Sequence, residues 1–269
     1  MPQVKSLWSY GETGYHSLAA AIVQDRYERE AMASAFRILG EGQLSLTKFL
    51  LLTDSSAGLD LKDFRATLTH ILERTTPETD LFVFPNLSMD SLDYTTPTIN
   101  RGSKGVWMGV GPKRRELPRE FRGSPGPSVT AVHVFSPGCL VVGAAPYRGS
   151  HEEESAVIAR VAADPAFAGW PLVVVSDEPA RAARSTINFL WTTFTRFEPA
   201  RDIHGAKQNV VANHVALSPP IAIDARTKPW YPTELFADEA TAKRVTTRWN
   251  EYFPGAKVEM GDSGKGHLD

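Results

Sequence analysis

Short apolar runs and amphipathic stretches alternate along this chain, and the order of the alternation repeats once. Continuous apolar runs of this length are typical of strands that are covered on both faces of a sheet. The runs that we interpret as strands are residues 4–10, 46–54, 80–85, 105–111, 129–135, 139–145, 171–177 and 221–225. The stretches with a helical apolar period are residues 16–39, 60–74, 151–163, 177–196 and 237–252. Strands that alternate with helices predict an α/β fold, layered α/β/α, with mostly parallel sheets.

The repeat is clearest in two segments that share one motif. Each begins with an apolar run that ends in an acid, continues through a helix-like stretch and closes with Arg-x-x-Pro-x-x-Asp. The matching residues are Asp54, Arg74, Pro77 and Asp80 in the first copy, and Asp177, Arg196, Pro199 and Asp202 in the second. Self-similarity of this kind indicates one supersecondary unit used twice. Because a cation and a following proline both suit the end of a helix, we interpret the motif as a fold-determining corner rather than a catalytic pair.

The segment 112–127 separates the two copies. It is charged, rich in proline and glycine, and has no apolar period, which is typical of a solvated linker. A basic patch for phosphate or nucleic acid is the weaker alternative. The expected organisation is a first α/β domain at 1–111, the linker at 112–127, a second α/β domain with a C-terminal helix at 128–255, and a flexible tail at 256–269.

Composition and charge exclude several classes of protein. The 269 residues carry a formal net charge of -2, which provides no basic footprint for nucleic acid. No apolar run approaches the length of a membrane span, and the amino terminus lacks the charged and apolar regions of a signal peptide. The single cysteine, Cys139, lies in an apolar run. We therefore interpret it as a buried structural thiol and expect a cytoplasmic protein.

Few residues suggest chemistry by themselves. The chain has no nucleotide-binding glycine motif, no catalytic serine motif and no pair of His or Cys at a metal-ligand spacing. Asp54 and Asp177 end strands, where α/β folds bind ligands, although capping of the next helix is the plainer alternative. Lys48 opens an otherwise apolar strand, and a lysine in such a place either extends to solvent or meets an anion. Pro171 stands at the comparable position of the second copy.

Several segments together resemble the C-terminal domain of the UbiD-type decarboxylases. In the first copy they are LTKFLLLTD (46–54), ERTTPETD (73–80), LDYTTP (92–97) and GSKGVWMG (102–109). In the second copy they are FLWTTFTRFEPARDIHG (189–205) and IAIDARTKPW (221–230). With YGETGYHSLAAAIVQDRY (10–27) and WNEYFPG (249–255), the chain is similar over nearly its whole length to the carboxyl-terminal half of the long, internally duplicated branch of that family.

The resemblance implies a carboxy-lyase. Such an enzyme catalyses reversible, non-oxidative decarboxylation of an aromatic or α,β-unsaturated acid, with prenylated FMN as the electron sink and with Mn2+ and K+ beside it. The resemblance also implies that the flavin-binding split barrel, the metal ligands and an Arg–Glu–acid set lie ahead of the matched region. We therefore assign no catalytic or metal-binding residue to this chain.

One cofactor-binding residue follows from the resemblance. Lys48 matches the family's lysine near the cofactor phosphate, where an ammonium would offset phosphate charge. The stretch 86–97, with Leu87, Met89 and Leu92, is a hypothesis for the substrate side. The second copy lacks the lysine, so we expect it to serve packing and oligomerisation.

Three functional hypotheses follow. In the first, the chain is a decarboxylase subunit of a homo- or hetero-oligomer and is inactive without a flavin-domain partner. The initial Met, followed by a strand, suits a separately encoded chain, and a fragment of a longer chain is the alternative that the sequence leaves open. In the second, the chain is a non-catalytic assembly module, which need not keep Lys48. The third is an independent α/β enzyme that uses Asp54 and Asp177, against which the missing nucleotide motifs argue.

Overall fold

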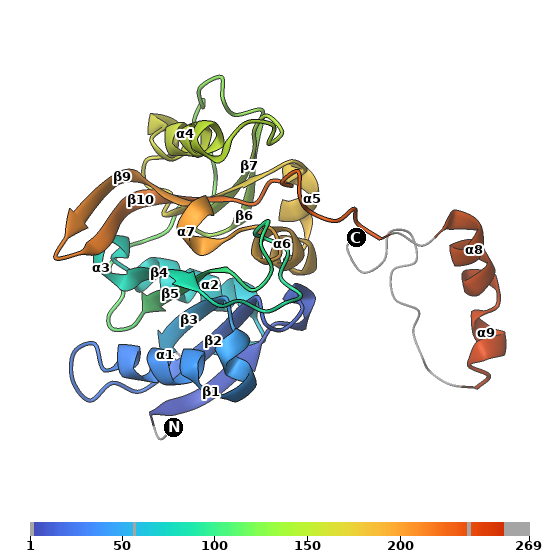
Figure 1. The fold of residues 1–269 in the computed structure, drawn as a ribbon, viewed down its shortest axis with the longest axis horizontal. Coiled ribbons are helices and arrows are strands. Elements are labelled where there is room, and N and C mark those ends of the chain that lie inside the picture. The colour runs from blue at the N-terminus through green and yellow to red at the C-terminus, as the bar shows by residue number, and fades with distance from the viewer. Residues whose placement is uncertain (1–2, 56–57, 236–237, 256–269) are drawn as a thin grey trace. The chain divides into compact units, whose positions relative to one another are not determined.

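The computed structural model describes residues 3–55, 58–235 and 238–255 of the chain (Figure 1). The chain divides into two compact units between Tyr231 and Pro232. The first unit holds both copies of the repeat, and the second holds two short helices. The expected flexible tail, residues 256–269, lies outside the described residues.

The first copy is a five-stranded sheet with the strand order β1-β2-β3-β5-β4. Its strands are β1 (Val4–Ser9), β2 (Leu18–Val23), β3 (Phe49–Asp54), β4 (Leu81–Leu87) and β5 (Gly102–Gly109). Its helices are α1 (Ala31–Gly40), α2 (Phe64–Arg74) and the single turn α3 (Pro77–Asp80). The three central strands run parallel, and β1 and β4 are antiparallel edges.

The second copy repeats this topology in the order β6-β7-β8-β10-β9. Its strands are β6 (Ala131–Ser136), β7 (Cys139–Gly143), β8 (Leu172–Ser176), β9 (Ile203–Val211) and β10 (His214–Asp224). Its helices are α4 (His151–Ala162), α5 (Pro179–Arg184), α6 (Thr186–Phe194) and α7 (Pro199–Asp202). Corresponding strands pair in the same sense in both sheets. The predicted α/β fold with two copies of one unit is confirmed, and each sheet is mixed, with a parallel centre and antiparallel edges.

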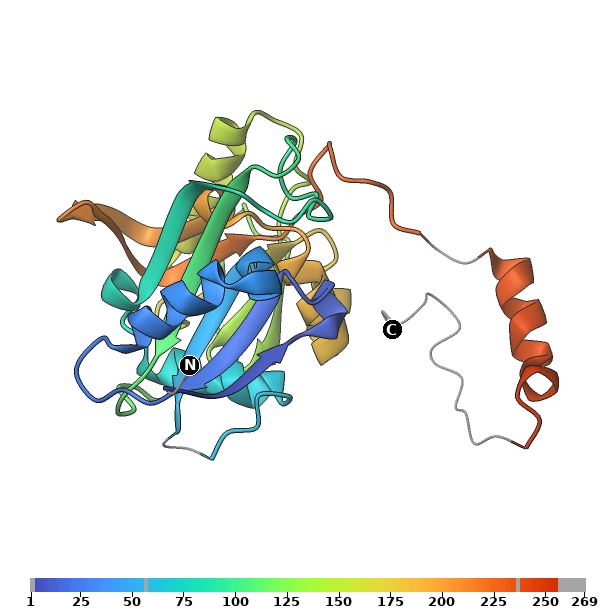
Figure 2. The same cartoon turned by 60° about the horizontal axis from the view of Figure 1, so that its bottom comes forward.

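Each sheet is covered on both faces. Successive side chains of a strand point to opposite faces, so Leu50 and Leu52 of β3 pack on one side, and Phe49 and Leu51 on the other. The outer face of the first sheet packs against α1, which comes forward in Figure 2, and the outer face of the second packs against α4. The inner faces share the helices between them (Figure 1). Each copy is therefore layered α/β/α, and the two copies share the middle helical layer.

This middle layer forms one hydrophobic core with an aromatic centre. The buried rings of that centre are Phe49, Phe64, Phe135, Phe189, Phe194 and Phe197. Phe135 and Phe189 stack with their centroids 3.7 Å apart. Phe64 of α2 contacts Phe189 and Phe194 of α6, at 5.8 and 6.0 Å between centroids. The inner face of each sheet is thus buried by residues from both copies.

The helix expected at residues 16–39 is wrong in its first half. Residues 18–23 form β2, which pairs with β1 and β3, and α1 begins only at Ala31. The run LAAAIV fits a helical face and a fully buried strand equally well, and all six residues of β2 are buried. The segment forms a strand because pairing with β1 and β3 satisfies the hydrogen bonds of its backbone N–H and C=O groups, which water does not reach.

Two further differences lie in the second copy. The helix expected at 177–196 is two helices, because Ser185 leaves the helical conformation and caps α6 by accepting a hydrogen bond from Asn188. Strand β9 is missing from the prediction, since five of its nine residues are exposed and leave no apolar period. It forms a long hairpin with β10 that turns at Ala212 and Asn213, both at positive φ.

The connection at residues 112–127 contains no helix or strand but is held by both copies. The backbone N–H groups of Arg114 and Arg115 donate to the carbonyl of Glu73, at 2.8 and 3.2 Å. The carbonyl of Pro118 accepts from Gly138, in the turn between β6 and β7, at 2.9 Å. The segment that the sequence describes as a solvated linker is therefore fixed to α2 at one end and to the second sheet at the other.

The second unit contains α8 (Glu239–Thr247) and α9 (Trp249–Tyr252), within the helix expected at 237–252. Asp238 caps α8 by accepting hydrogen bonds from Ala240 and Thr241. Of the helices in the described ranges, none has both the length and the apolar character needed to cross a membrane.

Phe189→Ala tests whether the two copies share one core. Removal of the ring that stacks on Phe135 is expected to lower the free energy of unfolding by about 3–5 kcal/mol. Both copies should still unfold in one cooperative transition in urea, followed by circular dichroism and tryptophan fluorescence. Phe36→Ala, at a residue that is 58% exposed, is expected to lower it by less than about 1 kcal/mol. Two separate transitions in the wild-type protein would contradict a shared core.

Candidate functional site

The Arg-x-x-Pro-x-x-Asp motif builds the same corner in both copies. Asp80 Oδ2 accepts a hydrogen bond from the backbone N–H of Thr76 at 2.7 Å. Asp202 Oδ2 accepts from Glu198 in the same way, also at 2.7 Å. Each bond closes the single helical turn that leads into the next strand. This geometry supports the prediction of a fold-determining corner.

The acids at the strand ends, Asp54 and Asp177, make equivalent hydrogen bonds in the two copies. Asp54 Oδ2 accepts from the backbone N–H of Gly111 at 2.6 Å, and Asp177 Oδ2 accepts from Thr227 at 2.6 Å. Each bond ties the end of one central strand to the segment that follows its parallel neighbour. The expectation that Asp177 caps the next helix is wrong, because the residue before α5 is Glu178, which makes no side-chain cap.

A small pocket with buried charges lies at the amino ends of β2 and β3. It has a volume of about 120 Å³ and is lined by Thr13, Gly14, His16, Ser17, Leu46, Lys48, Met89, Asp90, Leu92 and Asp93. Lys48 Nζ lies 2.8 Å from Asp93 Oδ2, and His16 Nδ1 pairs with Asp90 Oδ2. Both acids belong to the loop between β4 and β5, so this loop supplies the negative charge of the pocket.

Lys48 places an ammonium with unused hydrogen-bonding capacity in this pocket. Its side chain is 2% exposed, and Nζ lies 5.4 Å from the centre of the Phe197 ring. The approach to Asp93 is close enough for an ion pair but is not aligned as a hydrogen bond, so Nζ donates no hydrogen bond to a described residue. A buried ammonium in this state is suited to a second anionic partner.

The second buried lysine of the site, Lys104 on β5, is bound differently. Its Nζ donates to the carbonyls of Ser45 and Thr47, at 2.7 Å each. Burial lowers the pKa of Lys104 to about 8, although the negative charges of Asp93 and Asp90 oppose the shift. Lys104 therefore loses its proton in mildly alkaline solution.

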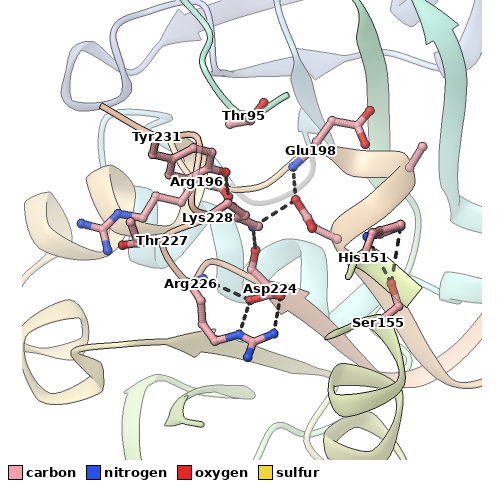
Figure 3. Close-up of polar contacts among 12 residues, drawn as sticks. Thr95, His151, Ser155, Arg196, Glu198, Asp224, Arg226, Thr227, Lys228 and Tyr231 are labelled. Atoms are coloured by element: carbon pink, nitrogen blue, oxygen red, sulfur yellow. Dashed lines mark hydrogen bonds and ion pairs between the residues drawn. The ribbon is translucent and has the colours of Figure 1, made fainter. Parts of the chain in front are cut away.

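The second copy buries charge at the opposite ends of its strands, after β10 (Figure 3). Arg226 donates from Nε and Nη2 to the two oxygens of Asp224, at 2.9 and 2.8 Å. Its Nη1 donates to the carbonyl of Ala145 at 2.7 Å and lies 2.9 Å from Glu154 Oε2. Burial opposes ionisation of Asp224, but the hydrogen bonds and charges of Arg226 and Lys228 lower its pKa.

Lys228 completes this cluster. Its Nζ donates to the carbonyls of Arg196 and Asp224 at 2.7 Å each and lies 3.1 Å from Asp202 Oδ2. Burial raises the pKa of Asp202 to about 6, against the opposing charge of Lys228. Unlike Lys48, Lys228 has its hydrogen bonds made within the chain, which marks this cluster as structural.

The two clusters occupy opposite ends of equivalent strands. Phe49 pairs with Gly105 in the first sheet and Leu172 pairs with Ile221 in the second, which aligns the copies residue by residue. In this alignment Lys48 and Lys104 correspond to Pro171 and Pro220. Asp224, Arg226 and Lys228 correspond in turn to Met108, Val110 and Pro112. Each copy therefore buries charge where the other has apolar residues or proline.

Residues of the second copy contact the loop and strand beside the first copy's pocket. Trp230 Nε1 donates to the carbonyl of Thr95 at 3.4 Å, and the backbone N–H of Ala200 donates to Ser103 Oγ at 2.8 Å. Phe197, also of the second copy, lies against the ammonium of Lys48. The surroundings of Lys48 are thus built from both copies.

The hydrophobic residues suggested for the substrate side fall on the loop between β4 and β5 or at its start. Leu92 is 72% exposed and Leu87 is 40% exposed, whereas Met89 is buried. Met89 and Leu92 line the pocket beside Lys48, and Leu87 does not. Only two of the three residues are therefore placed next to the predicted cofactor contact.

His16, Asp90, Asp93 and Lys104 are missing from the predicted site. Lys104 carries a usable signal, because it stands in the otherwise apolar strand GSKGVWMG just as Lys48 stands before FLLLTD. The two acids lie in a polar stretch without periodicity, and only the return of the loop toward β3 brings them to Lys48. Among the residues that the structure describes, no three His, Cys, Asp or Glu side chains gather in a way that could hold a metal ion.

Cys139 is a free, buried thiol, as the sequence predicts, and burial raises its pKa. The structure gives it no part in the charged pocket.

Comparison with known proteins gives this site a family context. Residues 1–109 match the family described as the 3-octaprenyl-4-hydroxybenzoate carboxy-lyase C-terminal domain, UbiD_C. The chain is 42% identical over 258 residues to a Chlamydia pneumoniae protein named as a subunit of 4-hydroxybenzoate decarboxylase, a match that covers 96% of this chain and 43% of that protein. An uncharacterized protein of Chlamydia trachomatis is 45% identical over 254 residues, which cover 94% of this chain and 42% of that protein. The chain thus spans less than half the length of these curated relatives.

Solved structures show weaker likenesses. The vanillic acid decarboxylase of Sedimentibacter hydroxybenzoicus in open form is 20% identical, with a TM-score of 0.38, over 45% of this chain and 26% of its own. The UbiD-class enzyme HmfF of Pelotomaculum thermopropionicum in complex with FMN is 17% identical, with a TM-score of 0.38, over 42% of this chain and 24% of its own.

The burial of Lys104 predicts a pH dependence of stability. The folded chain releases this proton near pH 8 and an ordinary lysine near pH 10.5, so between these values the unfolded state binds more protons. The free energy of unfolding should therefore rise with pH across this window. Urea unfolding of the wild type and of Lys104→Met, at several pH values from about 7 to 10, measures the effect. Equal slopes of unfolding free energy against pH in the two proteins would show that Lys104 is not the source.

Asp224→Asn tests the cluster of the second copy. Loss of the carboxylate leaves the buried charge of Arg226 poorly compensated and is expected to lower the free energy of unfolding by about 3–5 kcal/mol. Glu120→Gln makes the same change in an exposed pair with Arg122 and is expected to cost about 1 kcal/mol or less. Similar losses in the two variants, measured by urea unfolding, would argue against a structural role for the cluster.

Proposed function

Because residues 1–109 belong to the UbiD C-terminal domain family, we propose that the chain is the C-terminal half of a UbiD-type decarboxylase. The proposed reaction is reversible, non-oxidative decarboxylation of an aromatic or α,β-unsaturated carboxylic acid with prenylated FMN. The observation that carries the proposal is the 42% identity, over 96% of the chain, to a relative named as part of a decarboxylase. That relative is more than twice as long as the matched region. On the family resemblance, the flavin-binding split barrel lies outside the matched region, and we assign it to a partner polypeptide.

Lys48 is the residue that we propose for contact with the cofactor. The pocket could bind an anionic group at Lys48 Nζ, because this atom is buried and none of its N–H groups donates a hydrogen bond to a described residue. Asp93 keeps the ammonium in place and leaves the pair without net charge. A phosphate oxygen that reaches Nζ would gain a charge-assisted hydrogen bond in a site shielded from water. When bound, prenylated FMN supplies the electron sink for the loss of carbon dioxide.

The rest of the chain has a supporting part in this proposal. Lys104 anchors the carbonyls of Ser45 and Thr47, immediately ahead of Lys48, and so holds the segment that positions the ammonium. Phe197 of the second copy lies under Lys48 and excludes water from it. Mn2+ and K+, which the family resemblance implies, are assigned to the partner as well.

The alternative function is a non-catalytic assembly module of such an enzyme. The observation that favours it is the exposed apolar side chains on the loop between β4 and β5, where Leu92, Tyr94 and Ile99 are 72%, 52% and 71% exposed. Apolar residues gathered on one loop suit contact with another polypeptide. A flavin-domain partner would use the same surface, so this surface alone does not distinguish a decarboxylase subunit from an assembly module. Bound cofactor and decarboxylase activity in the complex would distinguish them.

Co-expression tests the proposed function. The chain would be purified alone and with a flavin-domain partner, in cells that make prenylated FMN, and the visible spectrum and carbon dioxide release recorded for each sample. The proposal predicts flavin absorbance and decarboxylation only in the complex. Activity of the chain alone would overturn the split of functions, and a complex that forms without flavin or activity would support the assembly module instead.

Lys48→Met tests the cofactor contact. Loss of one charge-assisted hydrogen bond to phosphate is expected to weaken flavin retention in the complex by about 10–100-fold, measured by flavin absorbance after gel filtration at increasing dilution. Lys207→Met, on the exposed part of β9, is the matched control and should retain flavin as the wild type does. Equal retention in all three proteins would remove Lys48 from the site.

A further inference from the structure

A second, larger pocket lies between the two copies and is separate from the Lys48 pocket. It has a volume of about 480 Å³, within the range of sites for small molecules, and is lined by both copies. The first copy contributes the end of β4 and the loop that follows, including Leu87, Thr96 and Arg101. The second copy contributes the turn α7, through Glu198, Ala200 and Arg201.

Glu198 brings to this pocket a carboxylate with one buried oxygen that has no hydrogen-bond partner among the described residues. The residue is 2% exposed, and its Oε2 accepts no hydrogen bond from any described residue. In Figure 3 its side chain extends away from Asp224 and Lys228, so the cationic cluster of the second copy does not neutralise it. An acid in this state is costly unless something outside the described chain pairs with it.

The fold itself does not require a carboxylate at this position. The corner uses only the backbone N–H of Glu198, which donates to Asp202. In the first copy the same bond is made by Thr76, which donates to Asp80. The corner thus forms with threonine in one copy and glutamate in the other. The carboxylate of Glu198 takes no part in this corner.

Two guanidinium groups line the same pocket. Arg201 lies over the ring of Trp230, at 5.6 Å from its centre, and this contact restrains its side chain. Arg101 is exposed at the rim. Neither guanidinium makes a hydrogen bond or ion pair with another described residue. Arg101, Arg201 and Glu198 all line the same pocket.

We propose that this pocket binds a small acid that carries a hydrogen-bond donor, ammonium or hydroxyl, at its other end. The donor meets Glu198 and the acid group meets Arg201 and Arg101, so that all three side chains gain partners at once. A simple carboxylic acid would satisfy the arginines and leave Glu198 unpaired. This proposal does not depend on the cofactor contact at Lys48.

Binding of three matched probes to the full chain tests the proposal. They are ε-aminocaproate, ε-hydroxycaproate and caproate, which share one acid and one chain length and differ only at the far end. Isothermal titration is expected to show at least one of the first two binding about tenfold more tightly than caproate, and the comparison between them identifies the donor. Equal affinities for all three, or binding by none, would overturn the proposal.

Two variants separate this site from a structural role for Glu198. Glu198→Gln keeps the shape of the side chain and should abolish the preference over caproate while leaving the melting temperature unchanged or higher, because a buried unpaired charge is removed. Arg201→Met should weaken all three probes. Glu152→Gln, at an exposed acid on α4, is the matched control and should change neither property. A lower melting temperature in Glu198→Gln with unchanged probe selectivity would assign Glu198 to the fold.

Discussion

The burial of two inner sheet faces against one shared layer of helices is the constraint on which the rest of the molecule depends. Each copy covers its outer face with its own helix, α1 or α4, but the inner face of each sheet is covered by a layer that both copies build. Burial of large aromatic rings dominates core energetics, and the rings of Phe64, Phe189 and Phe135 meet across the two copies. Duplication here produces one body with a core that both copies build.

The shared core also determines where charge can be buried. It brings α7 against β4 and β5, Phe197 against Lys48, and Trp230 after β10 against Thr95 in the loop between β4 and β5. The first copy then carries a lysine with unused donors, whereas the second carries an arginine and a lysine whose donors are used within the chain. The two copies share topology, but we propose different roles for their buried cations: Lys48 toward a ligand, and Arg226 and Lys228 toward the fold.

Much of the architecture could be predicted from the sequence, because the repeated motif encodes local structure. Proline after a helix end and aspartate three residues later build the corner through contacts within a few residues, and short apolar runs locate most strands. The failures have physical causes. LAAAIV satisfies a helix and a buried strand equally, and only pairing with β1 and β3 decides between them. Strand β9 is held by its hairpin with β10 rather than by an apolar face of its own.

The candidate sites were less accessible to sequence reasoning. Lys48 could be found because a lysine at the start of an apolar strand violates the local pattern. Asp93 and Glu198 violate no local pattern, since each stands in a polar segment. Asp93 becomes important through its contact with Lys48, and Glu198 because the turn that carries it is buried against the other copy.

An experimental structure of the chain in complex with the proposed flavin-domain partner and prenylated FMN tests the assignment of Lys48 most directly. We predict that the cofactor phosphate lies within hydrogen-bond distance of Lys48 Nζ, about 3 Å, and that Arg226 and Lys228 keep their present partners. A phosphate bound at Arg226 and Lys228, or bound away from both copies, would contradict the roles proposed for Lys48 and for the cluster of Asp224, Arg226 and Lys228.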